Sequence, residues 1–331
     1  MQPIVLPSNR PAARFYLGGP KLARFRSEPD EPRDEPEDWV ASVTTLAGET
    51  ALGLTRLPDG TLLADAIRSA PAAWLGDEHV ARFGDDTRLL VKLLDAGQRL
   101  PVHAHPDAAF ADGHLARRHG KAEAWYIVDG GEVHLGLTRD VGRHELEQLV
   151  ASQDNEALLS MLHRRAVDPG DVVFVPAGVL HAIGEGVLLV ELQEPEDLSI
   201  LLEWRGFALD GERDGHLGLT FSVALDAVEL RGRTTDEIDA LVMPAGFGGS
   251  VLPVGADPFF RLEHRRIDGG VELEEGFQVL VVLEGELRDT GSGLTLPRGS
   301  TTVVPHSAGP LVLKGAGELL SCRPPAAAPR P

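Results

Sequence analysis

Short apolar runs separated by turn residues fill much of the chain between residues 89 and 192. The run Val172–Val175 contains only β-branched and aromatic residues, and Gly170 and Pro176 lie on either side of it. A run of this length and composition is typical of a short buried strand with a turn at each end. Further strands are expected over residues 89–94, 124–128, 133–137 and 187–192. The pattern therefore predicts a mainly β unit with close turns.

One segment of this unit has a helical pattern instead. From Arg143 to Ala166 the apolar residues recur at helical spacings, with an interruption near Asp154. This pattern predicts two short helices, inserted between strands near residues 142–166. Helices are also expected over residues 217–225 and 235–241, and acidic residues near the start of the second suit a helix N-terminus.

The C-terminal part of the chain returns to a strand pattern. Turns are expected at E-G-E (284–286), L-P-R-G (296–299) and V-P-H (304–306). Their regular spacing is typical of a second all-β barrel or sandwich. The strands are expected over residues 259–265, 276–283, 294–296, 301–304 and 311–313.

These patterns suggest a division of the chain into two units and a tail. We expect a first domain over residues 1–240, with the helical insertion inside it, and a second over residues 241–323. The last residues, 324–331, are rich in proline and alanine, and we expect them to be disordered.

Composition narrows the possible partners. The 331 residues include 51 acidic and 31 basic side chains, a formal charge of −20. Such a charge repels nucleic acid and anionic membranes, so we expect neither as a partner. Cys322 is the only cysteine, which excludes an internal disulfide and a thiolate zinc site. With no apolar leader or long apolar run in the sequence, we expect a cytoplasmic protein.

Four residues near the predicted strand ends have the chemistry of metal ligands. His103 and His105 are two positions apart, so on a strand both side chains point to the same face. Glu123 begins another predicted strand, and His181 follows the turn after Val175. Three imidazoles and one carboxylate suit Zn²⁺ or another divalent first-row metal. For His181, a purely structural hydrogen bond at a strand end remains an alternative.

The segment from Gly170 to His181 carries the spacing G-x5-P-x-G-x2-H, which resembles the second motif of the cupins. Within the cupins, the chain resembles the class I mannose-6-phosphate isomerases, especially the short bacterial type. The resemblance implies two jelly-roll β-barrels, of which the first binds metal and the second does not. The matching stretches are G-G-P-K-L (18–22), E-D-W-V-A-S (37–42), V-H-A-H-P-D (102–107), G-K-A-E-A-W-Y-I (120–127) and L-V-E-L-Q-E-P-E-D (189–197).

The resemblance also implies a ligand set for one zinc ion. The family's pattern of Gln-x-His, a glutamate and a later histidine maps onto His105, Glu123 and His181, with His103 at the glutamine position. This exchange is a departure from the family. Because imidazole replaces a neutral amide, the preferred metal and its geometry can change.

Aldose–ketose isomerisation moves a proton between neighbouring carbons through an enediol, so it needs a base and an electrophile. By the resemblance, Glu191 is the candidate base; orienting a metal ligand is its alternative role. Lys121 is a candidate to hold a substrate oxygen or donate a proton. Glu37 and Trp39 are candidates to line the sugar pocket, although Trp39 can equally pack in the core.

Three further positions complete the expectations for the site. We expect Trp125 to face away from Lys121 and to pack in the core. Leu201 occupies a position where the short enzymes carry an arginine, and Ala108 one where many relatives carry a lysine. Arg205, four residues after Leu201, is the candidate to replace the arginine. Without these cations a neutral sugar becomes an alternative to a phosphorylated one.

The function expected from the sequence is therefore a metal-dependent isomerase of the mannose-6-phosphate isomerase type. It would interconvert mannose 6-phosphate and fructose 6-phosphate, or the unphosphorylated sugars. Two alternatives remain open: a metal-bound cupin that binds a sugar without turnover, and an oxygen-using cupin with Fe²⁺. The expected partner is a small sugar or sugar phosphate, and the oligomeric state is left open.

Overall fold

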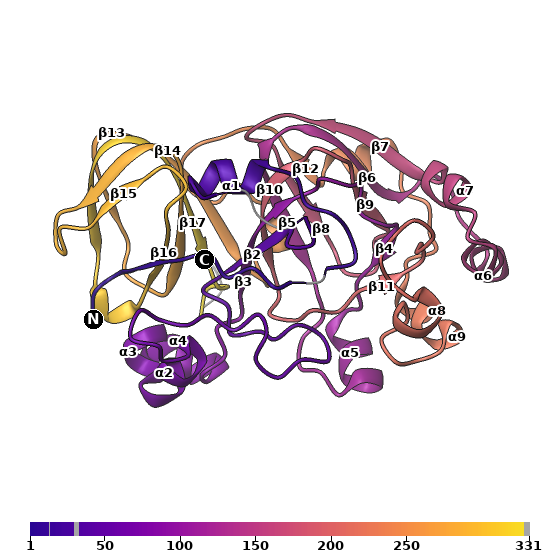
Figure 1. The fold of residues 1–331 in the computed structure, drawn as a ribbon, viewed down its shortest axis with the longest axis horizontal. Helices are drawn as coiled ribbons and strands as arrows, with labels where there is room; N and C mark the ends of the chain where they lie inside the picture. The colour runs from indigo at the N-terminus through magenta and orange to yellow at the C-terminus, as the bar shows by residue number, and fades with distance from the viewer. Residues whose placement is uncertain (13, 30–32, 328–331) are drawn as a thin grey trace.

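The computed structural model describes residues 1–12, 14–29 and 33–327. Its strands form three antiparallel sheets, and the helices lie at the periphery of these sheets (Figure 1). The prediction of a mainly β protein with a helical insertion is confirmed. None of the described helices has the length and apolar content that a membrane span requires.

Two sheets build the N-terminal part and share one hydrophobic core. Buried side chains from both, such as Trp125 from the first and Leu135 from the second, belong to the same apolar cluster. The first sheet has the order β12 (Val242–Met243), β8 (Val172–Val175), β5 (Glu123–Asp129), β10 (Leu188–Gln193), β3 (Leu90–Asp95) and β2 (Glu37–Val40). The second has the order β11 (Ile200–Leu201), β4 (His103–Ala104), β9 (His181–Ile183), β6 (Gly131–Leu137) and β7 (Leu162–Val167).

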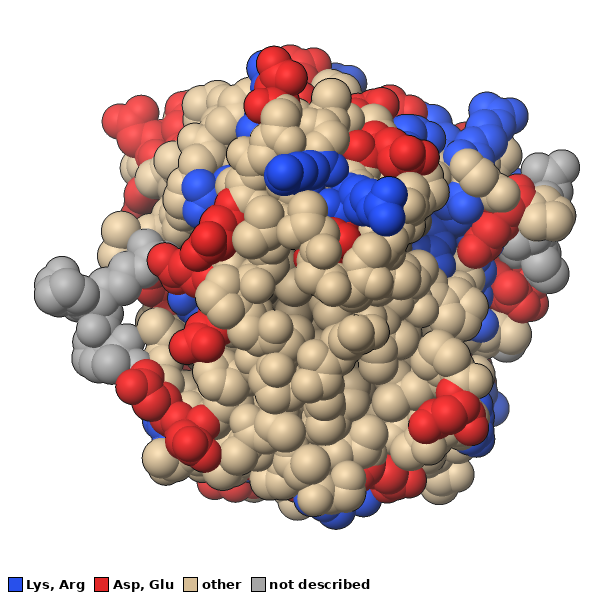
Figure 2. Space-filling view, turned by 90° about the vertical axis from the view of Figure 1, so that its left-hand side faces the viewer, with Lys and Arg blue, Asp and Glu red and all other residues tan. Residues whose placement is uncertain are grey.

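The third sheet contains the C-terminal strands and the first strand of the chain, and it lies on the left in Figure 1. On this side the surface has a broad area with few charged side chains (Figure 2). The order of the sheet is β1 (Ile4–Leu6), β16 (Thr301–Val304), β14 (Gln278–Asp289), β17 (Leu311–Arg323) and β13 (Arg261–Leu273), with β15 (Thr295–Pro297) paired to β14.

The helices are short. Three 3₁₀ turns cover Leu225–Ala227, Val254–Ala256 and His306–Ala308. The α-helices are α1 (Lys21–Arg26), α2 (Leu63–Ser69), α3 (Pro71–Leu75), α4 (Asp77–Phe83), α5 (Ala108–Leu115), α6 (Arg143–Ser152), α7 (Asn155–Ser160), α8 (Gly211–Asp214), α9 (Phe221–Ala224) and α10 (Thr235–Asp239). A capping box between Thr234 and Glu237 starts α10, where the acidic residues indicated a first turn.

The helical insertion is confirmed as α6 and α7, and the side chain of Asp154 caps α7 by accepting from the Ala157 amide. The helical pattern was extended too far, however, because residues 162–166 belong to strand β7. The helix expected over residues 217–225 is also shorter. Leu217 and Gly218 have positive φ angles of 58° and 78°, which no right-handed helix accommodates.

The turn expected at E-G-E is wrong, because β14 continues through it. The pairing of β14 with β17 shifts between Val282 and Glu284, and Gly285 has a φ of 74°. Both features are those of a β-bulge, which bends a strand without ending it. Gly285 therefore has the positive φ angle that is typical of a turn residue, but the chain does not reverse its direction there.

The proposed division of the chain near residue 240 stays a prediction. Each of the two expected domains contributes a strand to a sheet of the other. Strand β12, just after residue 240, pairs with β8, and β1 at the start of the chain pairs with β16. Of the tail expected to be disordered, residues 328–331 lie outside the described residues. Arg82 donates hydrogen bonds to the carbonyls of Ala326 and Ala327 in the part before them.

Candidate active site

The turn between β8 and β9 positions two of the predicted ligands at once. Its Gly178 has a φ of 85°, a conformation that a glycine adopts without strain. The Gly178 amide donates to the carbonyl oxygen of His105 over 2.7 Å, which holds the segment after β4 against the turn. His181 begins β9, directly opposite His103 in β4. The turn thus brings candidate ligands from distant parts of the sequence together.

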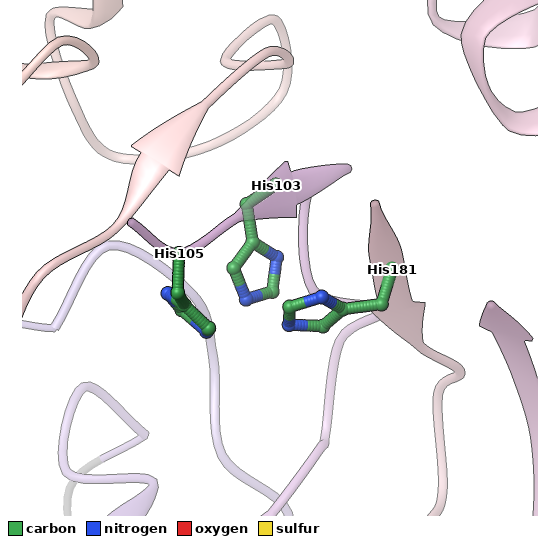
Figure 3. Close-up of side chains that lie close together, drawn as sticks. All are labelled: His103, His105 and His181. Atoms are coloured by element: carbon green, nitrogen blue, oxygen red, sulfur yellow. The ribbon is translucent and has the colours of Figure 1, made fainter. Parts of the chain in front are cut away.

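The imidazoles of His103, His105 and His181 converge, and one ring nitrogen from each lies within 4.8 Å of the others (Figure 3). Each Nδ1 atom hydrogen bonds to a backbone carbonyl: that of Pro101 at 2.8 Å, Leu198 at 2.7 Å and Val179 at 2.8 Å, respectively. A carbonyl only accepts, so every Nδ1 carries the proton and every Nε2 presents a lone pair. This tautomer is the one that a metal requires.

Glu123 completes the group from the start of β5. Its Oε2 lies 3.0 Å from Nε2 of His105, and its Oε1 lies 3.1 Å from Nε2 of His181. In the tautomer described above, both nitrogens and both oxygens are acceptors. Among the described residues, Nε2 of His181 is buried and has no hydrogen bond partner. Since a cation would satisfy such converging acceptors, these side chains fit a divalent metal.

The protonation states of this group also suit a metal. Burial lowers the pKa of His105 to about 3, assisted by the charge of Lys121, and burial lowers the pKa of His103 well below its usual value. Burial acts to raise the pKa of Glu123, but Lys121 and the neighbouring histidines outweigh it and hold this pKa well below its usual value. These imidazoles are neutral and the carboxylate is ionised near neutral pH, as metal ligands must be.

Lys121 lies beside the ligands, as expected from its position two residues before Glu123. Its Nζ is 3.1 Å from Oε2 of Glu123 and 3.0 Å from Nε2 of His105. The expectation for Trp125 is wrong in part. The ring is fully buried, but its Nε1 donates to Oε1 of Glu123 over 3.1 Å. Positions 121, 123 and 125 share parity, so on a strand all three point to one face.

A row of side chains crosses the first sheet next to the ligands. Glu191 in β10 is opposite Trp125 in β5 on one side and opposite Lys92 in β3 on the other. Lys92 is in turn opposite Trp39 in β2. Residues directly opposite each other in antiparallel strands share a face, so this row extends from the ligand strand to the edge of the sheet. The candidate base therefore lies on the same face as Glu123.

Lys92 connects two buried carboxylates within this row. Its Nζ is 3.5 Å from Oε2 of Glu191 and 3.6 Å from Oε2 of Glu37, and it lies 4.8 Å from the Trp39 ring centre. Burial raises the pKa of Glu191 to about 7, against the opposing charge of Lys92 and with the support of the Glu123 charge. Glu191 therefore titrates near neutrality, which suits a group that accepts and returns a proton.

Glu37 belongs to a buried polar network that the sequence did not indicate. Its carboxylate accepts from Tyr16 Oη and Trp39 Nε1, both at 2.6 Å, and from Arg14 Nε at 3.1 Å. Burial alone would raise its pKa, but Arg14 and Lys92 hold the pKa below its usual range. Arg14 also lies 3.6 Å from Asp197. Trp39 has no exposed surface, so its ring packs within the protein.

Sequence reasoning missed Lys92, although one signal was available. Lys92 interrupts the apolar run L-L-V-K-L-L, and a lysine within a buried strand needs charged partners. Arg14, Tyr16 and Asp197 gave no comparable signal, because they lie outside regular strands and reach the site through the fold.

Arg205 is not brought to this group of residues. Its side chain is exposed and donates to the carbonyl oxygen of Ser152 over 3.0 Å, and its backbone amide donates to Gln153. Leu201, by contrast, is 4% exposed and lies directly opposite His103 in the pairing of β11 with β4. The residue opposite the candidate ligand His103 is therefore Leu201, and Arg205 lies near the helical insertion.

The chain is similar to known isomerases in both sequence and structure. No protein-family model matches the chain. The mannose-6-phosphate isomerase of Streptococcus mutans is 30% identical over 254 residues, which cover 72% of this chain and 76% of the relative.

Solved structures share the fold over almost the whole chain. The mannose 6-phosphate isomerase of Bacillus subtilis superposes with a TM-score of 0.73 over 98% of this chain and 100% of the other, at 23% identity. A mannose 6-phosphate isomerase bound with zinc and yttrium gives a TM-score of 0.75 over 98% and 100%, at 16% identity. These neighbours have the cupin fold, so the predicted fold class is confirmed. By its sequence relatives, the chain belongs to the mannose-6-phosphate isomerase family.

Proposed function

We propose that the protein is a metal-dependent aldose–ketose isomerase acting on a sugar of the mannose type. The named activity of its relatives supports this class of reaction. The observation that carries the proposal is that Glu191 lies on the same face as Glu123, in the neighbouring strand of the first sheet, with the pKa of Glu191 raised to about 7. A base poised near neutrality beside a metal site is what a proton transfer between sugar carbons needs.

We propose that His103, His105, Glu123 and His181 hold one divalent metal ion, and that this ion is zinc. Three neutral imidazoles and one carboxylate are ligands that zinc accepts: one ring nitrogen of each histidine lies within 4.8 Å of the others, and Glu123 lies 3.0 and 3.1 Å from those of His105 and His181. When bound, the metal supplies a Lewis acid that polarises the carbonyl and hydroxyl oxygens of the sugar.

Glu191 is the proposed base. As a carboxylate, it takes the proton from C2 of the open-chain aldose, while Lys121 gives a proton to the carbonyl oxygen at C1, which yields the enediol. Glu191 then returns its proton to C1 while the C2 hydroxyl gives its proton back to Lys121 and becomes the carbonyl, so both side chains are regenerated. Lys92 holds the ionised form in place through the contact at 3.5 Å. Lys121, between Glu123 and His105, is the proposed donor to a sugar oxygen.

Glu37 and Trp39 have supporting roles in this proposal. Both are buried, and they contact Lys92 from the side opposite to Glu191, so we propose that they position the lysine. Arg205 has no part in the reaction that we propose, because its side chain donates to Ser152 at the surface. The cytoplasm is the proposed location, as expected from the composition.

The test compares conversion of aldose to ketose by zinc-loaded protein, by the same protein after chelation, and by Glu191→Gln. We expect conversion only by the loaded wild-type protein, with zinc content unchanged in the variant. Glu185→Gln, in the exposed turn before β10, is the control and should remain active. A protein that is stabilised by sugar but never converts it would reject the isomerase proposal in favour of a binding protein.

A further inference from the structure

We propose that Trp125 is a positioning residue of the candidate metal centre: its indole N–H holds the carboxylate of Glu123 in the orientation in which that side chain binds a metal ion. The inference rests on the proposed metal site and goes beyond it, because Trp125 is not itself a ligand. Its effect on the ion would pass through Glu123 alone.

Trp125 contacts two candidate ligands from different sheets. Its ring has no exposed surface, and its Nε1 donates to Oε1 of Glu123 over 3.1 Å. Glu123 is 1% exposed, so bulk water does not compete for this oxygen. A buried hydrogen bond to an ionised carboxylate belongs to the stronger class of hydrogen bonds. The same ring lies 5.6 Å from the imidazole of His181, at an angle of 58° between the ring planes.

Two donors together set the orientation of the Glu123 carboxylate. The last torsion of a glutamate has a broad energy well, so the rotamer alone does not fix the plane of the carboxylate. Trp125 donates to Oε1, and Nζ of Lys121 lies 3.1 Å from Oε2. Because these contacts fall on different oxygens, they define the plane between them.

Only one of these two donors can stay in place during the proposed reaction. Lys121 exchanges a proton with the sugar oxygens in that reaction, so its contact with Glu123 is interrupted. The indole N–H of Trp125 is a donor that does not titrate, and the ring is held by burial. Trp125 is therefore the donor that orients Glu123 throughout the cycle.

The same local arrangement occurs a second time in this sheet. The sequence E-x-W stands at 37–39 and again at 123–125. Nε1 of Trp39 donates to Oε2 of Glu37 over 2.6 Å, and this ring is fully buried as well. Residues two apart on a strand share a face, which lets each indole reach the carboxylate two positions before it. Since Glu37 is not a candidate ligand, Trp39 offers a matched control for Trp125.

The first test replaces Trp125 by phenylalanine, which keeps an aromatic ring and removes the N–H. We expect Trp125→Phe to bind zinc roughly tenfold or more weakly in chelator competition, as is usual when the partner that orients a metal ligand is lost. The visible spectrum of its Co²⁺ form should differ from the wild type, because this spectrum reports the ligand geometry. Trp39→Phe removes the same kind of bond and should leave zinc affinity and spectrum unchanged.

Three results of this test would overturn the inference. These are equal zinc affinity in Trp125→Phe and wild type, an unchanged cobalt spectrum, and an equal loss of affinity in Trp39→Phe. The last result would show that the loss follows from a smaller ring in the core and not from the bond to Glu123.

A second test uses the wild-type protein and stays decisive if Trp125→Phe does not fold. With ¹⁵N-labelled tryptophan, the four tryptophans give four indole N–H signals in the NMR spectrum. Single phenylalanine variants identify the signals of Trp39, Trp74 and Trp204, and the remaining signal belongs to Trp125. Addition of zinc should shift the Trp125 signal further than those of Trp74 and Trp204, and an unshifted Trp125 signal would overturn the inference.

These outcomes separate the inference from the proposed function. If the wild type binds metal and the zinc affinity of Trp125→Phe is unchanged, the inference fails alone and the proposed metal site stands. If the wild type binds neither zinc nor cobalt, the proposed metal site is rejected, and the role of Trp125 is rejected with it. None of these measurements depends on turnover of a sugar.

Discussion

Replacing Lys92 by methionine tests the buried charge row directly. The substitution keeps an unbranched side chain of similar length but removes the ammonium group between Glu37 and Glu191. Lys92 is 2% exposed, so water cannot take its place without a change in packing. Glu37 keeps Arg14 as a partner, whereas Glu191 loses the cation at 3.5 Å. The loss of electrostatic stabilisation should therefore fall mainly on Glu191.

The magnitude follows from these distances. For a pair at 3.5 Å, an effective dielectric constant of about 20 gives a gross attraction of roughly 5 kcal/mol. Desolvation of the lysine offsets part of this attraction, and breaking a buried pair costs about 3–5 kcal/mol in measured cases. Glu191 can take up a proton once the lysine is gone, so we expect the lower value. The free energy of unfolding should therefore fall by about 3 kcal/mol near neutral pH.

The pH dependence has a definite sign. The pKa of Glu191 is about 7 in the folded protein, above its ordinary value of 4.5, and Lys92 acts to lower it. Without Lys92 the folded-state pKa rises further, while the unfolded-state pKa does not change. Above pH 7 the folded variant then holds a proton that the unfolded chain has lost, so its stability falls as pH rises. The difference from the wild type should grow by about 1.4 kcal/mol per pH unit until the new pKa is reached.

The assay is urea unfolding of metal-free protein at several pH values between about 6.5 and 8.5. Lys92→Arg is the matched control, because it keeps the charge and should give a smaller loss that does not vary with pH. A difference between the wild type and Lys92→Met that stays constant over this range would refute the argument that Lys92 holds Glu191 in its ionised form.

Three further predictions concern the metal centre. His105→Ala and His181→Ala should lose zinc on dialysis, because each removes an imidazole from a buried group; metal analysis of the dialysed proteins checks this, and full retention would contradict the ligand assignment. His103→Gln should retain zinc but bind it roughly tenfold or more weakly in chelator competition, since an amide oxygen replaces a nitrogen ligand; equal affinity would exclude His103 as a ligand. Glu191→Gln should keep its zinc and lose turnover by about 10²-fold or more, and retained turnover would reject its role as base.

The candidate metal ligands could be brought together from the sequence because the information is local. His103 and His105 are neighbours on one strand, and His181 follows a turn whose glycine and proline positions are visible in the sequence. Strand β8 coincides with the predicted run Val172–Val175 for the same reason, since turn residues bound it on both sides. Local spacing determines which side chains share a face of a strand. The candidate ligands and strand β8 could therefore be found from short stretches of sequence.

The buried charge row could not be predicted in the same way. Glu37, Lys92 and Glu191 meet only because β2, β3 and β10 are neighbours in the sheet, although the sequence separates them widely. Strand order and register are set by the packing of the whole core, which no short pattern encodes. Arg205 was expected near the site because it is only four residues after Leu201. The chain leaves β11 between these two residues, however, so Arg205 lies beside the helical insertion.

The register of the paired strands therefore connects the candidate metal site with the other candidate site residues. Across β5, β10, β3 and β2 the residues Trp125, Glu191, Lys92 and Trp39 are directly opposite one another, and Trp125 in turn donates to the ligand Glu123. A shift of one residue in any of these pairings would turn the side chains of one strand to the other face of the sheet. The candidate base, its cation and the candidate ligand Glu123 are thus held in one arrangement by the backbone pairing itself. Changes in the apolar residues that fix this register should accordingly affect turnover without touching any group that contacts the sugar.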